Sequence, residues 1–503
     1  MKAKRIILVT LMLALLVASY ITTDRATSAR DAESGNRFLQ VNGAQQQTSG
    51  GQPQNNGTNS LAGAWQGELE AGIKLRLILK VAQAADGSLT STLDSLDQAA
   101  TNLPVDTITL DGARVRFEMK RLGAIYEGTL SANKSEIVGE WKQGPTTLPL
   151  TFKRTAKPLV LNRPQEPKKP YPYAEEEVAY ENKTDGVRLA GTLTLPRSQK
   201  PVPAVLLITG SGAQDRNETV FGHKPFLVLA DYLTRRGIAV LRVDDRGLGR
   251  STGNFITATS ENFVLDAAAG VEFLKTRKEI NPKQIGLVGH SEGGMIAPML
   301  AAKSSDAAFI VLMAGPGLSG EEILYRQAAL ILKASGATDE AIAKNRIGQE
   351  RYFAVIRGER DNTIAARRIR EISTELEAGM TEEQKKALRS SDAQTQFMLS
   401  PWFRYFLTYD PRPTLRKVQI PVLAINGERD LQVPPKGNLA AIAEALKAGG
   451  NKDFTTVELP RLNHLFQESK TGNVDEYGKI EETFSPAALQ LISDWILKRT
   501  LQR

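Results

Sequence analysis

Polar and apolar residues alternate along residues 61–154, and a period of two is typical of strands with one buried face. The segments 74–80 and 115–119 show the alternation clearly, and Asp-Gly pairs at 86–87 and 111–112 are typical turns between strands. The segment 63–67 (Gly-Ala-Trp-Gln-Gly) is echoed by Gly-Glu-Trp at 139–141. We therefore predict a small all-β domain, a barrel or a sandwich, over 61–154. It shows no acid–base constellation, so an accessory role is expected.

From about residue 174 the pattern changes to short apolar segments that alternate with helical stretches. After a hairpin at 178–195, apolar segments occur at 205–208, 238–243, 285–288, 309–313, 422–425 and 456–459, with helical patterns at 221–236, 260–277, 292–303, 434–448 and 485–499. Strands that are apolar throughout are buried on both faces of a parallel sheet. The alternation predicts an α/β domain over 174–503 with a doubly wound, mostly parallel sheet. The charged, helical interval 318–416 is predicted to be a cap near the carboxyl ends of the strands.

Two segments lack such patterns. Residues 155–173 contain five prolines, which favour an extended linker. Residues 30–60 are rich in Gln, Asn, Gly and Ser and contain too few apolar residues to bury, so we predict a disordered spacer.

The first 29 residues resemble an export signal. Lys2, Lys4 and Arg5 precede an apolar run from Ile6 to about Ile21, and small polar residues follow up to Ala29. We expect a signal peptide cleaved after Ala29 and a periplasmic or extracellular protein. The alternative is an uncleaved N-terminal anchor, which would be the chain's one contact with a membrane.

Composition removes several classes of chemistry. The chain has 503 residues, no cysteine and three histidines, which excludes thiol nucleophiles and offers no metal-ligand spacing. The net charge of +8 comes from scattered basic residues, so no nucleic-acid partner is expected. We predict neither a metal nor a cofactor, and the composition does not indicate an oligomeric state.

The clearest chemical signal is Gly-His-Ser-Glu-Gly at 289–293. It follows an apolar strand and precedes a helical run, which is the setting of a nucleophile elbow. Glycines on both sides permit the tight turn that exposes the hydroxyl of Ser291. Ser291 is the predicted nucleophile.

A serine hydroxyl needs a base and an acid to orient that base. His290 adjoins the serine on the turn and should point elsewhere, and His223 precedes it in the chain. Only His464 fits the chain order serine, acid, histidine. Asp430 follows a strand at the active end of the sheet, and Glu428 is a rival two residues earlier.

An oxyanion requires two aimed backbone N–H groups. One is expected from Glu292, directly after the nucleophile at a helix N-terminus. The second is assigned to Ser211 in the loop after the 205–208 strand.

Residues 174–503 resemble the α/β-hydrolase superfamily in the order of the elbow, the Asp430 loop and His464. The turn at 244–251 (Asp-Asp-Arg-Gly-Leu-Gly-Arg-Ser) is similar to its Asp-x-Arg-Gly-x-Gly-x-Ser turn. The segment 210–216 and the extra Gly294 are most like secreted bacterial carboxylesterases related to the serine-aminopeptidase-like group. The resemblance implies an acyl-enzyme without a cofactor, and its Gly-x-x-Asp pattern favours Asp430 over Glu428. The chain departs from it at Thr209, where most members have histidine. The Gly-x-Trp-x-Gly at 63–67 faintly resembles lipocalin-like barrels.

We therefore expect a serine esterase that cleaves a small-molecule carboxylic ester. One alternative is a peptidase or aminopeptidase with the same triad, in which Glu321 or Glu322 of the cap would hold the substrate amine. Another is a non-catalytic binding protein. The charged residues at 215–216 and 244–246 are interpreted as loop-fixing ion pairs, and Arg326, Glu321 and Glu322 as a solvated helix face.

Overall fold

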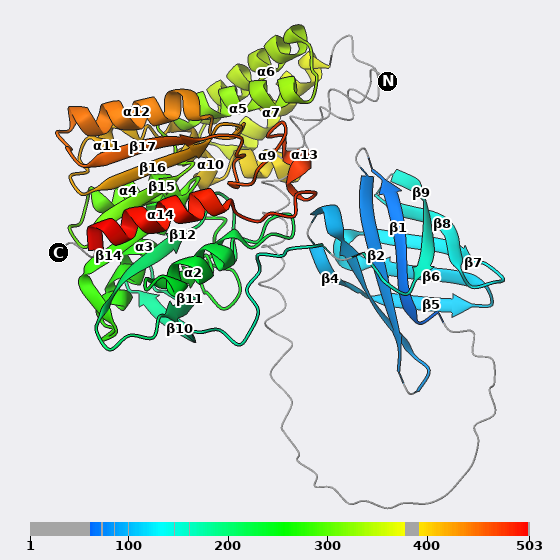
Figure 1. The fold of residues 1–503 in the computed structure, drawn as a ribbon. Coiled ribbons are helices and arrows are strands. Elements are labelled where there is room, and N and C mark those ends of the chain that lie inside the picture. Colours follow the sequence, from blue (N-terminus) through cyan, green and yellow to red (C-terminus); the bar gives the residue numbers. More distant parts are fainter. Residues whose placement is uncertain are drawn as a thin grey trace, which may run out of the picture. The chain divides into compact units, whose positions relative to one another are not determined.

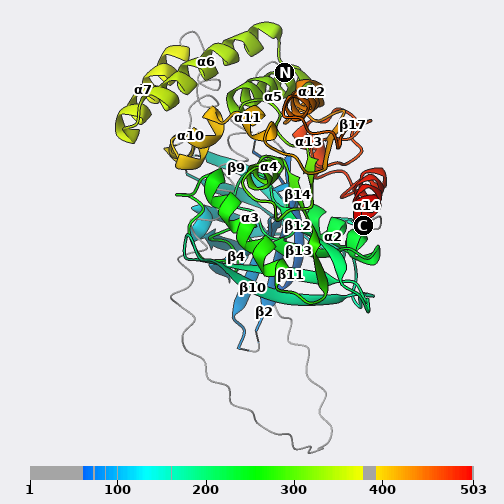
Figure 2. The same ribbon diagram turned by 90° about the vertical axis from the view of Figure 1, so that its left-hand side faces the viewer.

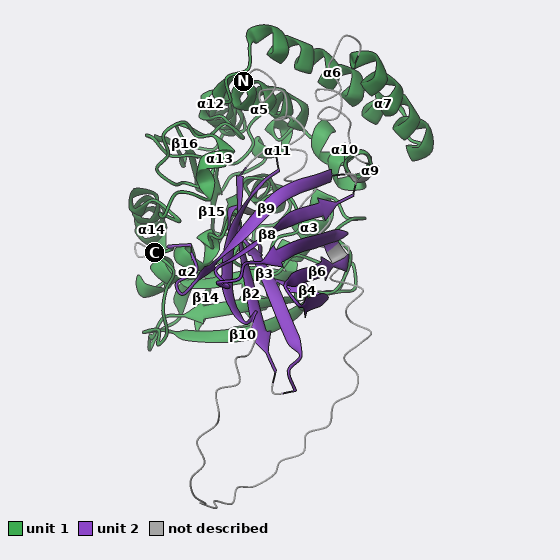
Figure 3. Cartoon of the chain, turned by 90° about the vertical axis from the view of Figure 1, so that its right-hand side faces the viewer, with its two compact units in different colours: residues 1–27, 163–503 green, residues 28–162 purple. Residues whose placement is uncertain are grey.

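The computed structural model describes residues 61–500 except 72–73, 85, 99, 145, 160 and 378–391. The chain forms two compact units that meet in sequence between Asn162 and Arg163, inside the predicted linker (Figure 3). The purple unit, labelled unit 2 in Figure 3, contains the earlier strands and is called the first unit here, and the green unit is called the second unit. The predicted signal at 1–29 and the spacer at 30–60 lie outside the described residues.

The first unit is a single antiparallel meander of nine strands. Each strand pairs with the next along the chain except β4 with β5, and β1 pairs with β9, so the sheet curls back on itself as a barrel that is open between β4 and β5 (Figure 1). The strands are β1 (Gly63–Glu70), β2 (Lys74–Gln83), β3 (Leu89–Ser95), β4 (Ala100–Val105), β5 (Thr107–Asp111), β6 (Arg114–Met119), β7 (Ala124–Leu130), β8 (Glu136–Gln143) and β9 (Thr146–Thr155).

Aromatic side chains fill the interior of this unit. Trp65, Phe117, Tyr126 and Phe152 are fully buried, and the rings of Phe117 and Tyr126 stack 5.0 Å apart. The Tyr126 hydroxyl lies 3.0 Å from two backbone carbonyl oxygens, which satisfies its polar end. The guanidinium of Arg154 covers the ring of Trp65 at 4.1 Å. The inward-facing residues of the alternating pattern thus form a packed structural core.

The second unit contains the predicted doubly wound sheet, with strand order β10-β11-β13-β12-β14-β15-β16-β17. The pairs β10–β11 and β11–β13 are antiparallel and all later pairs are parallel. The strands are β10 (Ala174–Asn182), β11 (Val187–Leu195), β12 (Val202–Ile208), β13 (Ala239–Val243), β14 (Ile280–His290), β15 (Phe309–Met313), β16 (Val422–Gly427) and β17 (Phe454–Leu459). This order and pairing confirm the predicted fold class.

Helices cover both faces of this sheet. On one face α2 (Pro225–Arg235) and α14 (Pro486–Thr500) pack in one apolar cluster. On the other face α3 (Ser260–Lys275), α4 (Gly293–Ala301) and α12 (Pro435–Ala448) share a second cluster with the cap (Figure 2). Both faces of the sheet are therefore buried, as the apolar strands require.

The cap is helical and is inserted between β15 and β16. It comprises α5 (Gly320–Ala334), α6 (Asp339–Gly358), α7 (Asn362–Leu376), α9 (Asp392–Met398), α10 (Pro401–Thr408) and α11 (Arg412–Leu415), while a short helix α13 (Val474–Tyr477) lies near the C-terminus. In Figure 2, α6 and α7 extend away from the sheet while α10 lies close to α3 and α4. Within the described ranges, no helix is long and apolar enough to cross a membrane.

Candidate active site

Ser291 occupies a strained turn between β14 and α4. Its φ is +51°, a left-handed conformation that is costly for a residue with a side chain. The turn is tight, because a Cβ on Gly289 would lie 2.0 Å from the carbonyl oxygen of Gly293. The backbone N–H of Ser291 donates to the carbonyl oxygen of Met313 at 2.8 Å, which fixes the turn to β15. The half-buried serine thus has the backbone geometry of a nucleophile elbow.

His464 and Asp430 meet at the same edge of the sheet. The Nδ1 atom of His464 lies 2.8 Å from Oδ2 of Asp430, and both side chains are buried. The second carboxylate oxygen of Asp430 accepts the backbone N–H groups of Gln432 and Val433, each at 2.8 Å. These donors fix the orientation of the carboxylate, so that Oδ2 faces His464. Glu428, the rival acid, instead accepts the backbone N–H of Arg461 at 2.7 Å.

Within the described chain, Ser291 Oγ forms no hydrogen bond with His464. Asp430 and His464 are thus joined by a direct contact. Ser291 is brought near them because its neighbour, His290, contacts His464. His290 Nε2 lies 2.9 Å from the carbonyl oxygen of His464, and the two imidazole rings are 4.8 Å apart. Hydrogen bonds between catalytic residues are often absent before substrate binds.

The loop after β12 lies directly beside the nucleophile. A Cβ on Gly210 would lie 3.2 Å from Cβ of Ser291, and Ser211 follows it. In the described part of the chain, the backbone N–H groups of Ser211 and Glu292 form no backbone hydrogen bond. Both predicted oxyanion donors therefore have no competing backbone acceptor.

The side chain of Glu292 joins this loop to the cap, which the sequence reasoning missed. Its buried carboxyl accepts Nε1–H of Trp402 from α10 at 2.8 Å, the hydroxyl of Ser260 from α3, and a hydrogen bond from Ser211. Burial raises the pKa of Glu292, and these hydrogen bonds lower it by less. Trp402 lies 110 residues from Glu292 in sequence, and no local pattern indicates the contact.

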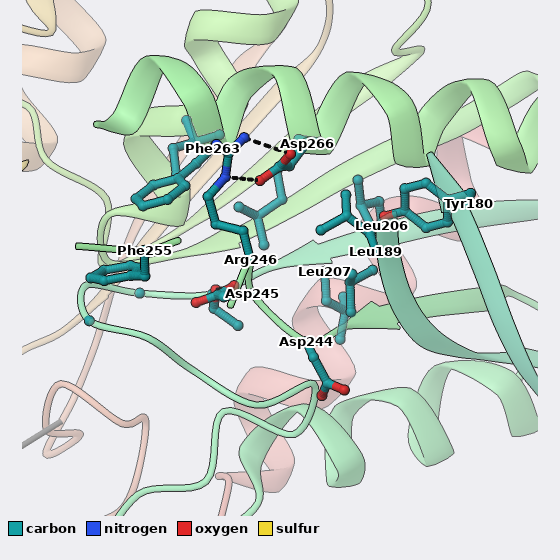
Figure 4. A pocket seen from close by; sticks show the side chains of 17 residues that line it. Tyr180, Leu189, Leu206, Leu207, Asp244, Asp245, Arg246, Phe255, Phe263 and Asp266 are labelled. Carbon is teal, nitrogen blue, oxygen red and sulfur yellow. Dashed lines mark hydrogen bonds and ion pairs between the residues drawn. The ribbon is translucent and has the colours of Figure 1, made fainter. Parts of the chain in front are cut away.

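Thr209 has a structural role at the position where the chain departs from the superfamily pattern. Its hydroxyl donates to Oδ1 of Asp245 at 2.8 Å, and the backbone N–H of Gln214 donates to Oδ2 at 2.8 Å. One carboxyl thus bridges both ends of the loop that carries Ser211. Asp245 faces a pocket beneath this loop (Figure 4), and burial there raises its pKa well above the usual range.

Two of the predicted loop-fixing ion pairs are formed. Arg216 pairs with Asp244 at 2.7 Å, and Arg246 pairs with Asp266 at 2.7 Å, as Figure 4 shows for the second pair. Asp245 and Asp215 differ from the prediction, because both accept hydrogen bonds from neutral donors instead of pairing with a basic side chain among the described residues.

The cap acids Glu321 and Glu322 are already bound within the cap. Glu321 pairs with Arg357 and accepts the hydroxyl of Tyr325 at 2.8 Å. Glu322 accepts the hydroxyl of Ser319 at the start of α5 and lies 3.3 Å from a guanidinium nitrogen of Arg412. Both carboxylates stay partly exposed, with 24% and 40% of their side-chain surfaces accessible, so the face is still solvated as predicted and each acid also pairs with an arginine.

No group of three or more His, Asp or Glu side chains in the described ranges is arranged to hold a metal. His223 is fully buried, and its ring nitrogens lie 2.9 Å from the hydroxyl of Thr483 and 3.0 Å from the carbonyl oxygen of Tyr477. Burial lowers the pKa of His223 to about 4. This histidine is a buried structural residue whose two ring nitrogens both have hydrogen-bond partners.

The strand order and the elbow define the second unit as an α/β-hydrolase. The sequence model of the X-Pro dipeptidyl-peptidase (S15) family matches residues 185–464, which is more than half of the chain, and the chain belongs to this family.

Curated relatives are matched over part of their length. Esterase EstD of Thermotoga maritima is 27% identical over 280 residues, 55% of this chain and 58% of EstD. An uncharacterized protein of Mycobacterium tuberculosis, Rv2307c, is 32% identical over 127 residues, 25% of this chain and 41% of that protein. The chain thus spans about half the length of these relatives.

Two solved structures have a fold similar to part of this chain. The Pyrococcus furiosus esterase Pf2001 is 17% identical, with a TM-score of 0.40 over 68% of this chain and 98% of that one. Est1E from Butyrivibrio proteoclasticus, solved with ferulic acid, is 16% identical, with a TM-score of 0.37 over 65% of this chain and 98% of that one.

Proposed function

We propose that this protein is a serine hydrolase that cleaves carboxylic esters through an acyl-enzyme. The observation that carries the proposal is the 2.8 Å contact between His464 Nδ1 and Asp430 Oδ2, at the edge of the sheet where the strained elbow presents Ser291. The similarity to an esterase of Thermotoga maritima supports the same reaction class.

The mechanism follows from the tautomer that Asp430 imposes. Because Asp430 accepts the Nδ1 proton of His464, Nε2 carries the lone pair and acts as the general base. Ser291 attacks the ester carbonyl as Nε2 takes its proton, and the N–H groups of Ser211 and Glu292 hold the oxyanion. His464 then protonates the leaving alkoxide. Water attacks the acyl group with His464 again as base, which releases the acid and restores Ser291.

Family membership favours a peptidase as the second candidate function. A peptidase that removes residues from a peptide's free end must hold the terminal ammonium group with a carboxylate. The two cap acids predicted for this purpose already pair with arginines, which reduces their capacity for a substrate amine. The structure therefore supports an ester more than an amino-terminal peptide.

The deciding experiment compares p-nitrophenyl esters of increasing acyl length with aminoacyl and Xaa-Pro p-nitroanilides on the purified protein. We expect ester hydrolysis with kcat/KM at least about tenfold above that for the anilides, because an ester has the better leaving group. Ser291→Ala should abolish both turnover and labelling by a fluorophosphonate probe while the fold is retained. Preference for anilides would establish the peptidase, and an unlabelled wild-type Ser291 would favour a binding protein.

A further inference from the structure

His290, the residue before the nucleophile, is buried and contacts two parts of the site at once. Its Nδ1 atom lies 2.9 Å from Oε1 of Glu218, and its Nε2 atom lies 2.9 Å from the carbonyl oxygen of His464. His290 and Glu218 are 4% and 3% exposed, so water does not compete for these contacts. Neither residue has a place in the mechanism above.

The partners of His290 determine where its protons lie. A carbonyl oxygen can only accept, so Nε2 of His290 carries a hydrogen. Oε1 of Glu218 already accepts the backbone N–H of Gly210 at 2.7 Å, as an ionised carboxylate oxygen does. Nδ1 therefore also carries a hydrogen, and the pair is an imidazolium and a carboxylate with zero net charge.

The electrostatics agree with this assignment. Burial lowers the pKa of His290, but the negative charge of Glu218, the carbonyl of His464 and the charge of Asp430 together move the pKa above its usual value. The remaining groups beside the ring are the imidazole of His464 at 4.8 Å and the phenyl ring of Phe466 at 6.2 Å.

Three active-site segments meet at this pair. His290 belongs to the elbow, Gly210 precedes the oxyanion donor Ser211, and the carbonyl bound by Nε2 belongs to the base His464 itself. A shift of the pair would move the oxyanion donor and the base relative to Ser291 together.

Glu218 is held in place at an energetic cost. Its φ is +52°, and its second oxygen, Oε2, is buried with no hydrogen-bond partner among the described residues. Asp215 fixes the turn by accepting the backbone N–H groups of Asn217 and Thr219, at 2.9 and 3.0 Å. Strained and incompletely bonded groups of this kind persist where the arrangement serves function.

We propose that Glu218 and His290 form a positioning ion pair, which holds the oxyanion loop and the loop of the catalytic base in register with Ser291. The inference rests on the proposed serine hydrolase function. Neither side chain touches the reacting atoms, so both are positioning residues.

Substitution of His290 separates the two contacts. The amide of His290→Asn can replace Nδ1 and keep the bond to Glu218, whereas that of His290→Gln can replace Nε2 and keep the bond to His464. Glu218→Gln leaves an amide whose oxygen can still accept from Gly210 but which carries no negative charge to balance the imidazolium. We expect kcat for p-nitrophenyl butyrate to fall about 10- to 100-fold in all three variants, with KM changed by less than about threefold, because small displacements of catalytic groups mainly affect the chemical step.

His223 provides the matched control. It is a second buried histidine with both ring nitrogens hydrogen-bonded, to the hydroxyl of Thr483 and to the backbone carbonyl oxygen of Tyr477, and neither of these two groups touches the reacting atoms in the mechanism above. His223→Asn and His223→Gln should lower the melting temperature while kcat per folded molecule stays within about twofold of wild type. If the His290 variants behave like the His223 variants, the positioning role is wrong.

A spectroscopic measurement tests the pair without relying on activity. The chain has three histidines, so ¹⁵N-histidine labelling gives few imidazole signals, and His290→Gln identifies those of His290. We expect both nitrogens of His290 to show protonated-type shifts throughout the neutral pH range. A singly protonated ring that titrates in that range would overturn the ion pair.

The two proposals fail differently. A wild-type protein that neither hydrolyses esters nor reacts with fluorophosphonate refutes the proposed function, and the NMR result still decides the ion pair. A wild-type esterase whose folded Glu218 and His290 variants keep kcat within about twofold refutes the positioning role alone. If those variants do not fold, Glu218→Asp keeps the charge on a shorter side chain, and unchanged kcat in it would also contradict the inference.

Discussion

At the scale of single residues, the site depends on carboxylates whose surroundings differ. Asp430 accepts from two backbone donors and contacts the imidazole of His464, so its carboxylate is held in place and orients the base. Glu292 is buried against Trp402 and Ser260, and burial raises its pKa. These opposite environments lead to different predictions for two acids of one site.

Replacing Asp430 should remove most of the turnover. Asp430→Asn can present its amide N–H to His464, which would place the imidazole proton on Nε2 and leave no base facing Ser291. We expect kcat to fall by about 10⁴-fold, the size of effect seen when a triad loses its acid. A discontinuous assay of ester hydrolysis measures this fall in kcat. The control variant Glu428→Gln should keep kcat within about threefold of wild type. Equal losses in both variants would contradict the assignment of Asp430.

Replacing Glu292 should change how stability depends on pH. Burial raises the folded-state pKa of Glu292 above its ordinary value of 4.5, so the stabilising contribution of Glu292 is fully present below pH 4.5 and is lost as pH rises through the folded pKa. Glu292→Gln removes this proton uptake, so its free energy of unfolding relative to wild type should rise with pH across that window. Urea unfolding at a series of pH values measures the difference, with exposed Glu444→Gln as the control. A constant difference at all pH values would show that Glu292 does not take up a proton on folding.

At the scale of elements, helix α10 of the cap is coupled to the elbow through one hydrogen-bonded side chain. Trp402 Nε1–H lies within 2.9 Å of both oxygens of Glu292, and the backbone N–H of Glu292 is a proposed oxyanion donor. The position of the cap helix is therefore linked to the geometry of the oxyanion site. Family resemblance alone would not indicate this link.

Trp402→Phe should weaken both stability and catalysis. The phenylalanine keeps an aromatic ring but removes one of the three donors to the buried carboxyl of Glu292, which costs about 1–3 kcal/mol of unfolding free energy. We expect kcat to fall roughly tenfold as α10 and the elbow lose their connection. Trp495→Phe in α14 is the control, because the indole N–H of Trp495 has no hydrogen-bond partner among the described residues. Similar losses of kcat in the two variants would refute the coupling.

At the scale of the whole molecule, the two units have separate apolar cores. The core of the first unit is built around Trp65, Phe117 and Tyr126, and the second unit has its own clusters on the two faces of its sheet. All proposed catalytic residues belong to the second unit. The first unit should therefore be dispensable for the chemical step.

Trp65→Ala tests this independence. Loss of a fully buried tryptophan costs about 3–5 kcal/mol, enough to unfold a small barrel. We expect calorimetry to show loss of one unfolding transition while kcat/KM for p-nitrophenyl butyrate stays within about twofold. A parallel loss of hydrolysis would show that the barrel supports the site.

Much of this arrangement could be predicted, because it depends on local patterns of polar, apolar and turn residues in the sequence. Period-two alternation over 61–154 and apolar strands after 174 follow from which faces must be buried. The elbow was visible as glycines around Ser291, and the scarcity of histidine together with chain order selected His464. Strand β14 begins at Ile280, earlier than the predicted 285, because Ile280 pairs with Val202 of β12 before a register shift that contains the polar residues 281–284.

The sequence by itself determined the fold class and the residues proposed for the triad, since burial periodicity and turn chemistry are local properties of the chain. Tertiary structure alone decided the partners of His290, Thr209 and Glu292. Glu218, Asp245 and Trp402 lie 72, 36 and 110 residues from them. Such hydrogen bonds form only when the strand ends and the cap come together in the folded chain. The spacing of these residues in the sequence therefore does not predict them.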